Sequence, residues 1–194
     1  MYDIDFFKKT NNLKKKITSG LLKSADIEDI GIELESLRKK SPHIYNIETT
    51  NYCNMKCVMC PRTMFMTRKN IWIDDKLFEN LITDIKIHDQ KNLENFWNWL
   101  ENDYRQAVKE ESENGFYFSI ISRHLVLHGF GEPFLDKNLI KRIKLCSKKK
   151  IPTYFSCTPA TMTIEKAEKA MEAGLGVLKF SLDAMDERKI QKIR

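Results

Sequence analysis

Residues 44–62 read IYNIETTNYCNMKCVMCPR, and this stretch decides the fold because a strand pattern leads directly into three cysteines. The apolar and β-branched residues within 44–50 predict a strand. Cys53, Cys57 and Cys60 follow at the spacing C-x3-C-x2-C, on the loop that leaves the carboxyl end of that strand. In parallel α/β folds the loops at this end of the strands carry the reactive groups. The stretch therefore predicts a parallel sheet with a candidate metal site at its edge.

Strand and helix patterns alternate along the rest of the chain. The elements expected after the first strand are a helix over 74–85, a strand over 125–128, a helix from about residue 137 to 146, a strand over 153–157, a helix over 164–171 and a strand over 177–182. Because a helix separates each strand from the next, the strands are expected to run parallel. The predicted fold class is α/β, a partial TIM-like (βα) barrel of about four parallel strands with alternating helices and an inserted amphipathic helix.

Two segments fall outside this alternation. Residues 1–42 are polar with short helical patterns, which predicts an N-terminal helical leader packed on a core domain that spans residues 43–194. Residues from about 88 to 118 form an acidic insertion in which apolar side chains recur at helical spacing, namely Leu93, Phe96, Trp97, Leu100, Tyr104 and Val108. We expect this insertion to form a helix that covers the outside or the edge of the sheet, with partner binding or substrate capping as the alternative.

The end of the chain also bears on the predicted fold. Four parallel strands do not close a barrel, and the chain stops at Arg194 shortly after the fourth. A parallel sheet needs its faces and edges covered. We therefore expect the chain to be an N-terminal fragment or a truncated form of a longer protein.

The composition excludes several classes of protein. The 194 residues are 42% hydrophobic and 31% charged, which is enough apolar content for one sizeable core. No apolar run is long enough to span a membrane, and charges interrupt residues 1–16, so neither a membrane protein nor a secretory signal is predicted. The net charge of +6 includes a basic run at 148–150, which suits a helix end, and no basic-aromatic module accompanies it. We expect a cytoplasmic protein that binds neither nucleic acid nor membrane.

The five cysteines cannot pair evenly, and three of them lie within eight positions, which is metal-ligand spacing rather than a disulfide framework. Three thiolates can hold three irons of a 4Fe-4S cluster and leave the fourth iron free to bind a small molecule. Zinc is the alternative, and it would need a fourth ligand from Cys146, Cys157 or a histidine. Cys146 falls on the apolar face of its helix, and we expect it and Cys157 to be structural.

The cysteine triad and its flanking residues resemble the radical S-adenosylmethionine (SAM) enzymes, especially the branch that carries a C-terminal SPASM domain. Residues 131–133, Gly-Glu-Pro, are similar to the family's GGEP motif, although Phe130 replaces its first glycine. Residues 181–183, Ser-Leu-Asp, are similar to its S-x-D segment. Residues 158–160 depart from the family's TNG-type turn, because they read Thr-Pro-Ala.

The resemblance implies a set of cofactor residues. Cys53, Cys57 and Cys60 would bind a 4Fe-4S cluster as its metal ligands. The positions implied to contact SAM are Gly131 and Glu132 for its amino group, Ser181 and Asp183 for its ribose and methionine parts, Arg194 for its carboxylate and Met59 for its adenine. No side chain is implied as a catalytic residue, since the cofactors perform the chemistry.

The resemblance implies an oxidoreductase that uses the cluster and SAM to generate a 5′-deoxyadenosyl radical and modify a substrate, for which a peptide is the expectation at the level of the family. It also implies a reductant such as flavodoxin or ferredoxin as a partner. Two other hypotheses remain open. One is a zinc-stabilised binding module, which would be colourless and need a nearby fourth ligand. The other is a scaffold that holds a cluster and never cleaves SAM.

Overall fold

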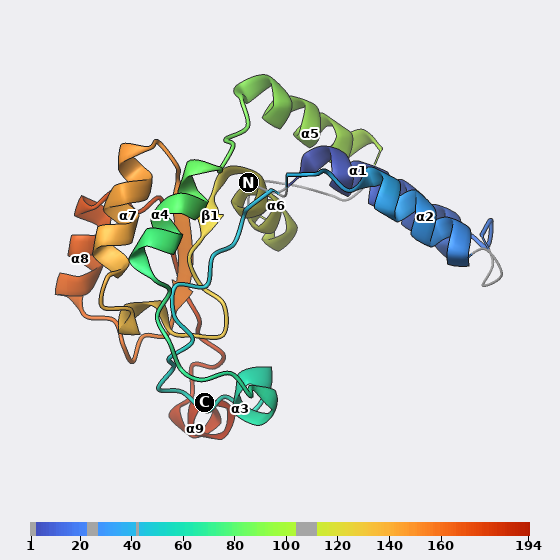
Figure 1. Ribbon diagram of the computed structural model, residues 1–194. Coiled ribbons are helices and arrows are strands. Elements are labelled where there is room, and N and C mark those ends of the chain that lie inside the picture. The colour runs from blue at the N-terminus through green and yellow to red at the C-terminus, as the bar shows by residue number, and fades with distance from the viewer. Residues whose placement is uncertain (1–2, 23–26, 42, 104–111) are drawn as a thin grey trace.

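Figure 1 shows the computed structural model, which describes residues 3–22, 27–41, 43–103 and 112–194. The helices are α1 (Ile4–Thr18), α2 (Ile27–Leu37), α3 (Pro61–Phe65), α4 (Asp75–Thr83), α5 (Gln90–Asn102), α6 (Glu113–Arg123), the short 3₁₀ helix η2 (Pro133–Leu135), α7 (Leu139–Lys148), α8 (Ile164–Glu172) and α9 (Glu187–Ile193). The strands are β1 (Leu125–Val126), β2 (Thr153–Cys157) and β3 (Val177–Phe180). None of the helices in the described ranges is long and apolar enough to cross a membrane.

The strands of the described residues form one parallel sheet in the order β1-β2-β3. Val126 pairs with Tyr154, and Ser156 pairs with Lys179. The α/β class and the parallel direction of the strands are thereby confirmed. β2 forms over its full predicted range, whereas β1 and β3 are shorter than predicted.

The predicted strand over 44–50 is only partly formed. Asn46 makes an isolated parallel bridge with Val126, and backbone hydrogen bonds of 2.8 Å accompany it. Thr50 instead makes an antiparallel bridge with Trp72, on the segment that returns from the cysteine loop. The segment therefore runs beside β1 at its start and is drawn away from it at its end, so the described residues form three regular strands rather than four.

One face of the sheet packs against α4, α7 and α8, which Figure 1 shows together on one side. Alternation along each strand sends every second side chain into this shared core. Its buried members include Ile47, Phe78, Ile82, Leu125, Leu127, Ile143, Cys146, Phe155, Cys157 and Ala170. Two of these helices begin at capping side chains, because Asp74 accepts the Leu77 N–H before α4 and Thr163 accepts the Lys166 N–H before α8.

The opposite face of the sheet is covered by α6. Ile120 of this helix belongs to a second buried cluster with Val126 and Tyr154, whose side chains face away from the core of α4, α7 and α8. Phe116, one turn earlier on α6, meets the Tyr154 ring edge-to-face at 6.0 Å. Helices thus cover both faces of the parallel sheet, as its burial requires.

The predicted insertion over about 88–118 forms α5 and the first half of α6 rather than a single helix. Tyr104 and Val108, which the helical spacing included, lie outside the described residues. The apolar face of α5 packs on α1 and α6 instead of on the sheet. The buried residues of this contact are Ile4, Phe96, Leu100, Phe118 and Ile121.

Arg142 of α7 joins three segments through one buried side chain, which is 1% exposed. Its guanidinium donates two hydrogen bonds to the Asp136 carboxylate, at 2.8 and 2.9 Å, and one to Asp75 at 2.7 Å. A fourth bond, of 2.7 Å, reaches the backbone oxygen of Ile73. Asp136 lies on the loop after β1 and Asp75 opens α4, so the cation fixes both segments to α7.

We expect Arg142→Met to lower the free energy of unfolding by about 3–5 kcal/mol, because Asp136 would remain as a buried carboxylate without its partner. Urea unfolding followed by circular dichroism measures this change. Lys144→Met, at an exposed site of the same helix, is the matched control and should change stability by less than about 0.5 kcal/mol. Equal stability of the two variants would show that the buried network does not hold these segments.

Candidate functional site

The loops that follow the strands meet at one end of the sheet. In Figure 1, α3 and α9 lie beside one another at this end, one after the cysteine loop and the other after β3. A hydrogen bond of 2.9 Å from the Val58 N–H to the Ile193 oxygen joins the two segments. Because parallel strands share the direction of their carboxyl ends, the loops that the sequence marks as reactive are neighbours in the structure.

Asn51 closes the base of the cysteine loop. Asn51 is only 2% exposed. Its side chain accepts a hydrogen bond of 2.7 Å from the Ile71 N–H and donates one of 2.9 Å to the backbone oxygen of Lys69. Its backbone oxygen accepts a 3.0 Å hydrogen bond from Nε of Arg62. The loop therefore leaves and returns at one fixed point. Sequence analysis did not single out Asn51, and the available signal was an amide side chain between a strand and the first cysteine.

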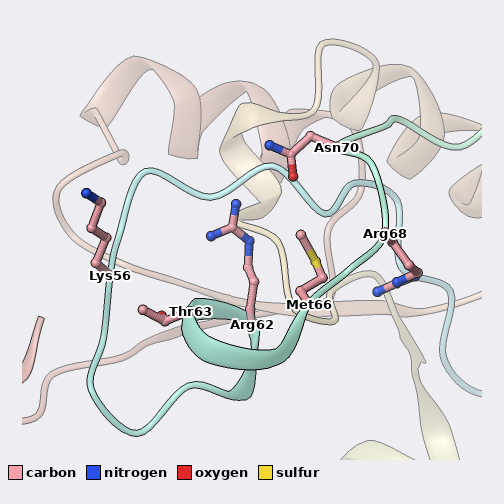
Figure 2. A pocket seen from close by; sticks show the side chains of 6 residues that line it. All are labelled: Lys56, Arg62, Thr63, Met66, Arg68 and Asn70. Atoms are coloured by element: carbon pink, nitrogen blue, oxygen red, sulfur yellow. The ribbon is translucent and has the colours of Figure 1, made fainter.

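A cationic pocket of about 500 Å³ lies beside this loop. Its lining residues, drawn in Figure 2, are Lys56, Arg62, Thr63, Met66, Arg68 and Asn70. Arg68 pairs with Glu48 at 2.9 Å, whereas Lys56 takes part in no ion pair within the described residues. The pocket therefore gives the cysteine loop a positively charged flank.

The three cysteines of the triad are free thiols, of which Cys57 is buried and Cys53 and Cys60 are half-buried. Burial raises the pKa of the Cys53 thiol, while the nearby charge of Arg62 acts in the opposite direction. Within the described residues, no three Cys, His, Asp or Glu side chains are close enough together to hold a metal ion. The donor set itself fits a thiophilic centre, because three thiols stand on one irregular loop of eight residues.

Cys146 and Cys157 belong to the core instead. They are 0% and 2% exposed, and burial raises the pKa of each thiol to about 12. A thiol with such a pKa stays protonated at neutral pH, whereas a metal ligand must be a thiolate. Their surroundings therefore support a structural role.

Gly131 and Glu132 lock the loop after β1 onto its neighbours. A Cβ on Gly131 would lie 1.9 Å from the Thr50 oxygen, so only glycine fits there. The next N–H, of Glu132, donates to the Tyr52 oxygen at 2.7 Å. Glu132 is only 3% exposed, and its carboxylate accepts a hydrogen bond of 2.9 Å from the Thr158 N–H. One residue thus ties the loop after β1 to both the cysteine loop and the loop after β2.

Ser181, Asp183 and Arg194 line one cavity of about 160 Å³. The Arg194 guanidinium forms an ion pair with the Asp183 carboxylate and donates a hydrogen bond of 3.0 Å to the backbone oxygen of Ser181. Its Nη1 atom lies 3.6 Å from the Cys57 sulfur. Arg194 therefore joins Ser181 and Asp183, which follow β3, to the middle cysteine.

The remaining residues assigned to SAM differ in how close they lie to this cavity. Glu132 reaches the same cavity indirectly, because its partner Thr158 lines it. Gly131 stands next to Glu132 in the loop. Met59 is 57% exposed and does not line the cavity. The structure thus brings Ser181, Asp183 and Arg194 together and leaves Met59 outside.

His128, to which sequence analysis gave no role, lies two residues after the end of β1, beside Ser156. Its Nδ1 accepts the Ser156 N–H at 3.2 Å, and the Ser156 hydroxyl lies 2.6 Å from the Ser181 hydroxyl. Burial and the nearby charge of Lys179 lower the pKa of His128 to about 4. The imidazole is therefore neutral at pH 7.

Comparisons with known proteins bear on this arrangement. A family model described as "Radical SAM superfamily" matches residues 47–194. Among solved structures, the chain is similar to one described as "Crystal structure of BtrN in complex with AdoMet and 2-DOIA", with a TM-score of 0.50 and 15% sequence identity over 79% of this chain and 51% of that chain. At this identity the likeness shows a shared fold, and the chain spans about half the length of that structure. No curated protein sequence matches.

We expect Gly131→Ala to lower the free energy of unfolding by at least about 2 kcal/mol, because its Cβ would overlap the backbone of Thr50. Urea unfolding measures the loss. Gly31→Ala is the matched control, since open space surrounds Gly31 within α2, and there alanine should stabilise the helix by up to about 1 kcal/mol. A Gly131 variant as stable as the unchanged protein would disprove this close approach.

The lowered pKa of His128 predicts that stability falls as the pH drops from about 6.5 to about 4. In this window the unfolded chain binds a proton at His128 that the folded chain does not bind, so protonation favours unfolding. The contribution of this residue amounts to at most about 3 kcal/mol, present above pH 6.5 and lost through pH 4. Urea unfolding across this range, with His128→Gln as the variant that loses this part of the slope, measures it. An imidazole that titrates near pH 6.5 by NMR would contradict the burial argument.

Proposed function

The chain belongs to the radical SAM superfamily, and on this premise we propose that it binds a 4Fe-4S cluster through Cys53, Cys57 and Cys60 and binds SAM beside it. When bound, the reduced cluster and SAM supply a 5′-deoxyadenosyl radical that removes a hydrogen atom from the substrate. The role of the protein is to hold these groups, to position the substrate and to exclude water. The donor set, three thiols on one loop, fits such a cluster.

One arrangement carries the proposal, namely the contact of Arg194 with both Asp183 and Cys57. A guanidinium has five N–H donors, so Arg194 can keep its bonds to Asp183 and Ser181 and still receive a carboxylate. A SAM carboxylate bound there would contact the guanidinium whose Nη1 atom lies 3.6 Å from the sulfur of the middle cysteine. The residues that would hold the amino-acid part of SAM are therefore next to a residue that would hold the cluster.

We propose that Glu132 accepts the amino group of SAM. Its carboxylate is buried and accepts two N–H groups, from Thr158 at 2.9 Å and from Phe134 at 3.4 Å, and an ionised carboxylate has about four acceptor sites. An ammonium group can therefore bind without displacing Thr158. Burial chiefly raises the pKa of both Cys53 and Cys157, and the negative charge of Glu132 adds to it, so Glu132 lies within electrostatic reach of the cysteine loop.

We propose that an acidic reductant of the flavodoxin or ferredoxin type docks over the cationic pocket of Figure 2. Lys56 lies between the first two cysteines in the sequence, and Arg62 follows the third by two positions. Positive charge beside the electron entry point would steer an acidic partner toward it. Met59 and Phe65, 57% and 73% exposed, provide apolar surface on the same loop and helix.

The finer assignment also belongs to this proposal. The residues that flank the cysteine triad and the position of Arg194 favour the SPASM-type branch, for which a peptide is the expected substrate class. The similar solved structure is described in complex with AdoMet, which supports SAM as a ligand of this fold. Its second ligand, 2-DOIA, belongs to that protein.

Zinc is disfavoured by the surroundings of the candidate fourth ligands. Cys146 and Cys157 are buried thiols whose pKa values of about 12 oppose the thiolate form. A cluster held by three thiolates needs no fourth protein ligand.

Anaerobic reconstitution of the 194-residue chain with iron and sulfide tests the proposed function. We expect a brown protein with about four irons per chain, and formation of 5′-deoxyadenosine on addition of SAM and dithionite. Cys57→Ala should lose the cluster, because a ligand is removed. Cys146→Ala is the matched control, since its thiol is buried in the core, and it should retain the full iron content.

Three results separate the hypotheses. A full cluster in the Cys57 variant would refute the ligand assignment. A colourless protein that binds zinc would favour the binding module. A brown protein that never yields 5′-deoxyadenosine would favour the scaffold that holds a cluster without SAM cleavage.

A further inference from the structure

A cavity of about 300 Å³ lies between α6 and the face of the sheet that α6 covers. Its apolar walls come from Phe116, Ile120, Val126 and the ring of Tyr154. None of the residues assigned to SAM or to the cluster lines it. A volume of about 300 Å³ with aromatic walls is at the small end of known ligand sites. The cavity is therefore large enough for a compact organic group.

A row of polar residues links this cavity to the proposed SAM site. Ser156 pairs with Lys179 across the sheet, and the ring of His128 accepts the Ser156 N–H at 3.2 Å. His128 and Lys179 line the cavity. On the other side of the row, the Ser156 hydroxyl lies 2.6 Å from that of Ser181, which lines the cavity assigned to SAM. The two cavities are thus separated by one row of side chains.

The hydrogen bond to His128 fixes its tautomer. Because Nδ1 accepts a hydrogen bond, the neutral imidazole carries its hydrogen on Nε2. Within the described residues neither this Nε2 nor the Tyr154 hydroxyl has a hydrogen-bond partner. Both are donors available to a ligand in the cavity.

Lys179 adds a positive charge to these donors. Its ammonium lies 5.5 Å from the centre of the Phe116 ring, and no carboxylate in the described ranges forms an ion pair with it. Glu113 also lines the cavity, but it stands in the first turn of α6, where it complements the helix dipole. The cavity therefore presents a cation and neutral donors beside an apolar wall.

We propose that this cavity binds the substrate through a carboxylate, with the apolar or aromatic part of the substrate between Phe116 and Tyr154. Lys179 supplies the ion pair, and Nε2 of His128 donates the second hydrogen bond. A peptide substrate would place its terminal carboxylate or a side-chain carboxylate in this cavity. This inference rests on the proposed function, since the substrate needs to lie one row of side chains from SAM.

The test uses the full chain without cluster or SAM, and phenylacetate as the probe with phenylacetamide as its neutral counterpart. Binding is measured by ligand-observed NMR titration. We expect phenylacetate to bind at least about tenfold more tightly than the amide, the difference that one charge-assisted hydrogen bond makes. Lys179→Met should remove this preference, and Lys179→Arg should retain most of it. Lys148→Met, an exposed lysine at the end of α7, is the matched control and should leave binding unchanged.

Equal binding of the two probes to the unchanged protein would overturn the inference, and this comparison does not depend on any variant. An unaltered preference in the Lys179→Met protein would overturn the role of Lys179. Formation of 5′-deoxyadenosine is measured separately on reconstituted protein. Its absence together with selective binding of phenylacetate would refute the proposed function and support the carboxylate site, whereas the opposite pair of results would refute only the carboxylate site.

Discussion

The loop after β1 lies directly against the backbone that leads into the cysteines, and the arrangement of the site depends on this contact. Gly131 permits it, since any side chain there would overlap Thr50. The Glu132 N–H then bonds to the Tyr52 oxygen, and the Glu132 carboxylate continues to the Thr158 N–H. Backbone hydrogen-bonding groups that are buried must be paired, so these bonds determine where the loops can lie. Three loops from different parts of the sequence are held together by two adjacent residues.

Buried charge reinforces this geometry from the side of the helices. Arg142 holds the loop after β1 and the start of α4 through Asp136 and Asp75. A buried ion pair contributes little net stability by comparison with apolar packing, but breaking it costs several kcal/mol, about 3–5 in measured cases. Such a pair therefore specifies one arrangement of the segments it joins. At the other end of the site, the ion pair of Arg194 with Asp183 keeps the last loop against Cys57.

The two faces of the sheet have different roles. The face toward α4, α7 and α8 is filled by apolar side chains and includes Cys146 and Cys157, whose burial keeps their thiols protonated. The face toward α6 carries His128, Ser156 and Lys179 and leaves a cavity. This division follows from alternation along the strands, because adjacent residues point to opposite faces. Cofactor and substrate chemistry is proposed for the polar face and the loops at its carboxyl edge.

The sequence by itself determined the order of strands and helices from residue 125 onward, the full extent of β2 and the spacing of the cysteine triad, because these follow from local periodicity and spacing. The resemblance to the radical SAM family grouped Ser181 and Asp183 with Arg194, and the structure brings these three residues to one cavity. Only the tertiary structure decided that the segment over 44–50 is shortened as a strand, that Asn51 closes the cysteine loop, and that His128 faces a cavity under α6. Each of these depends on contacts between separate elements, as in the bond from Asn51 to Lys69 or the packing of α6 beside His128, and local periodicity carries no record of such contacts.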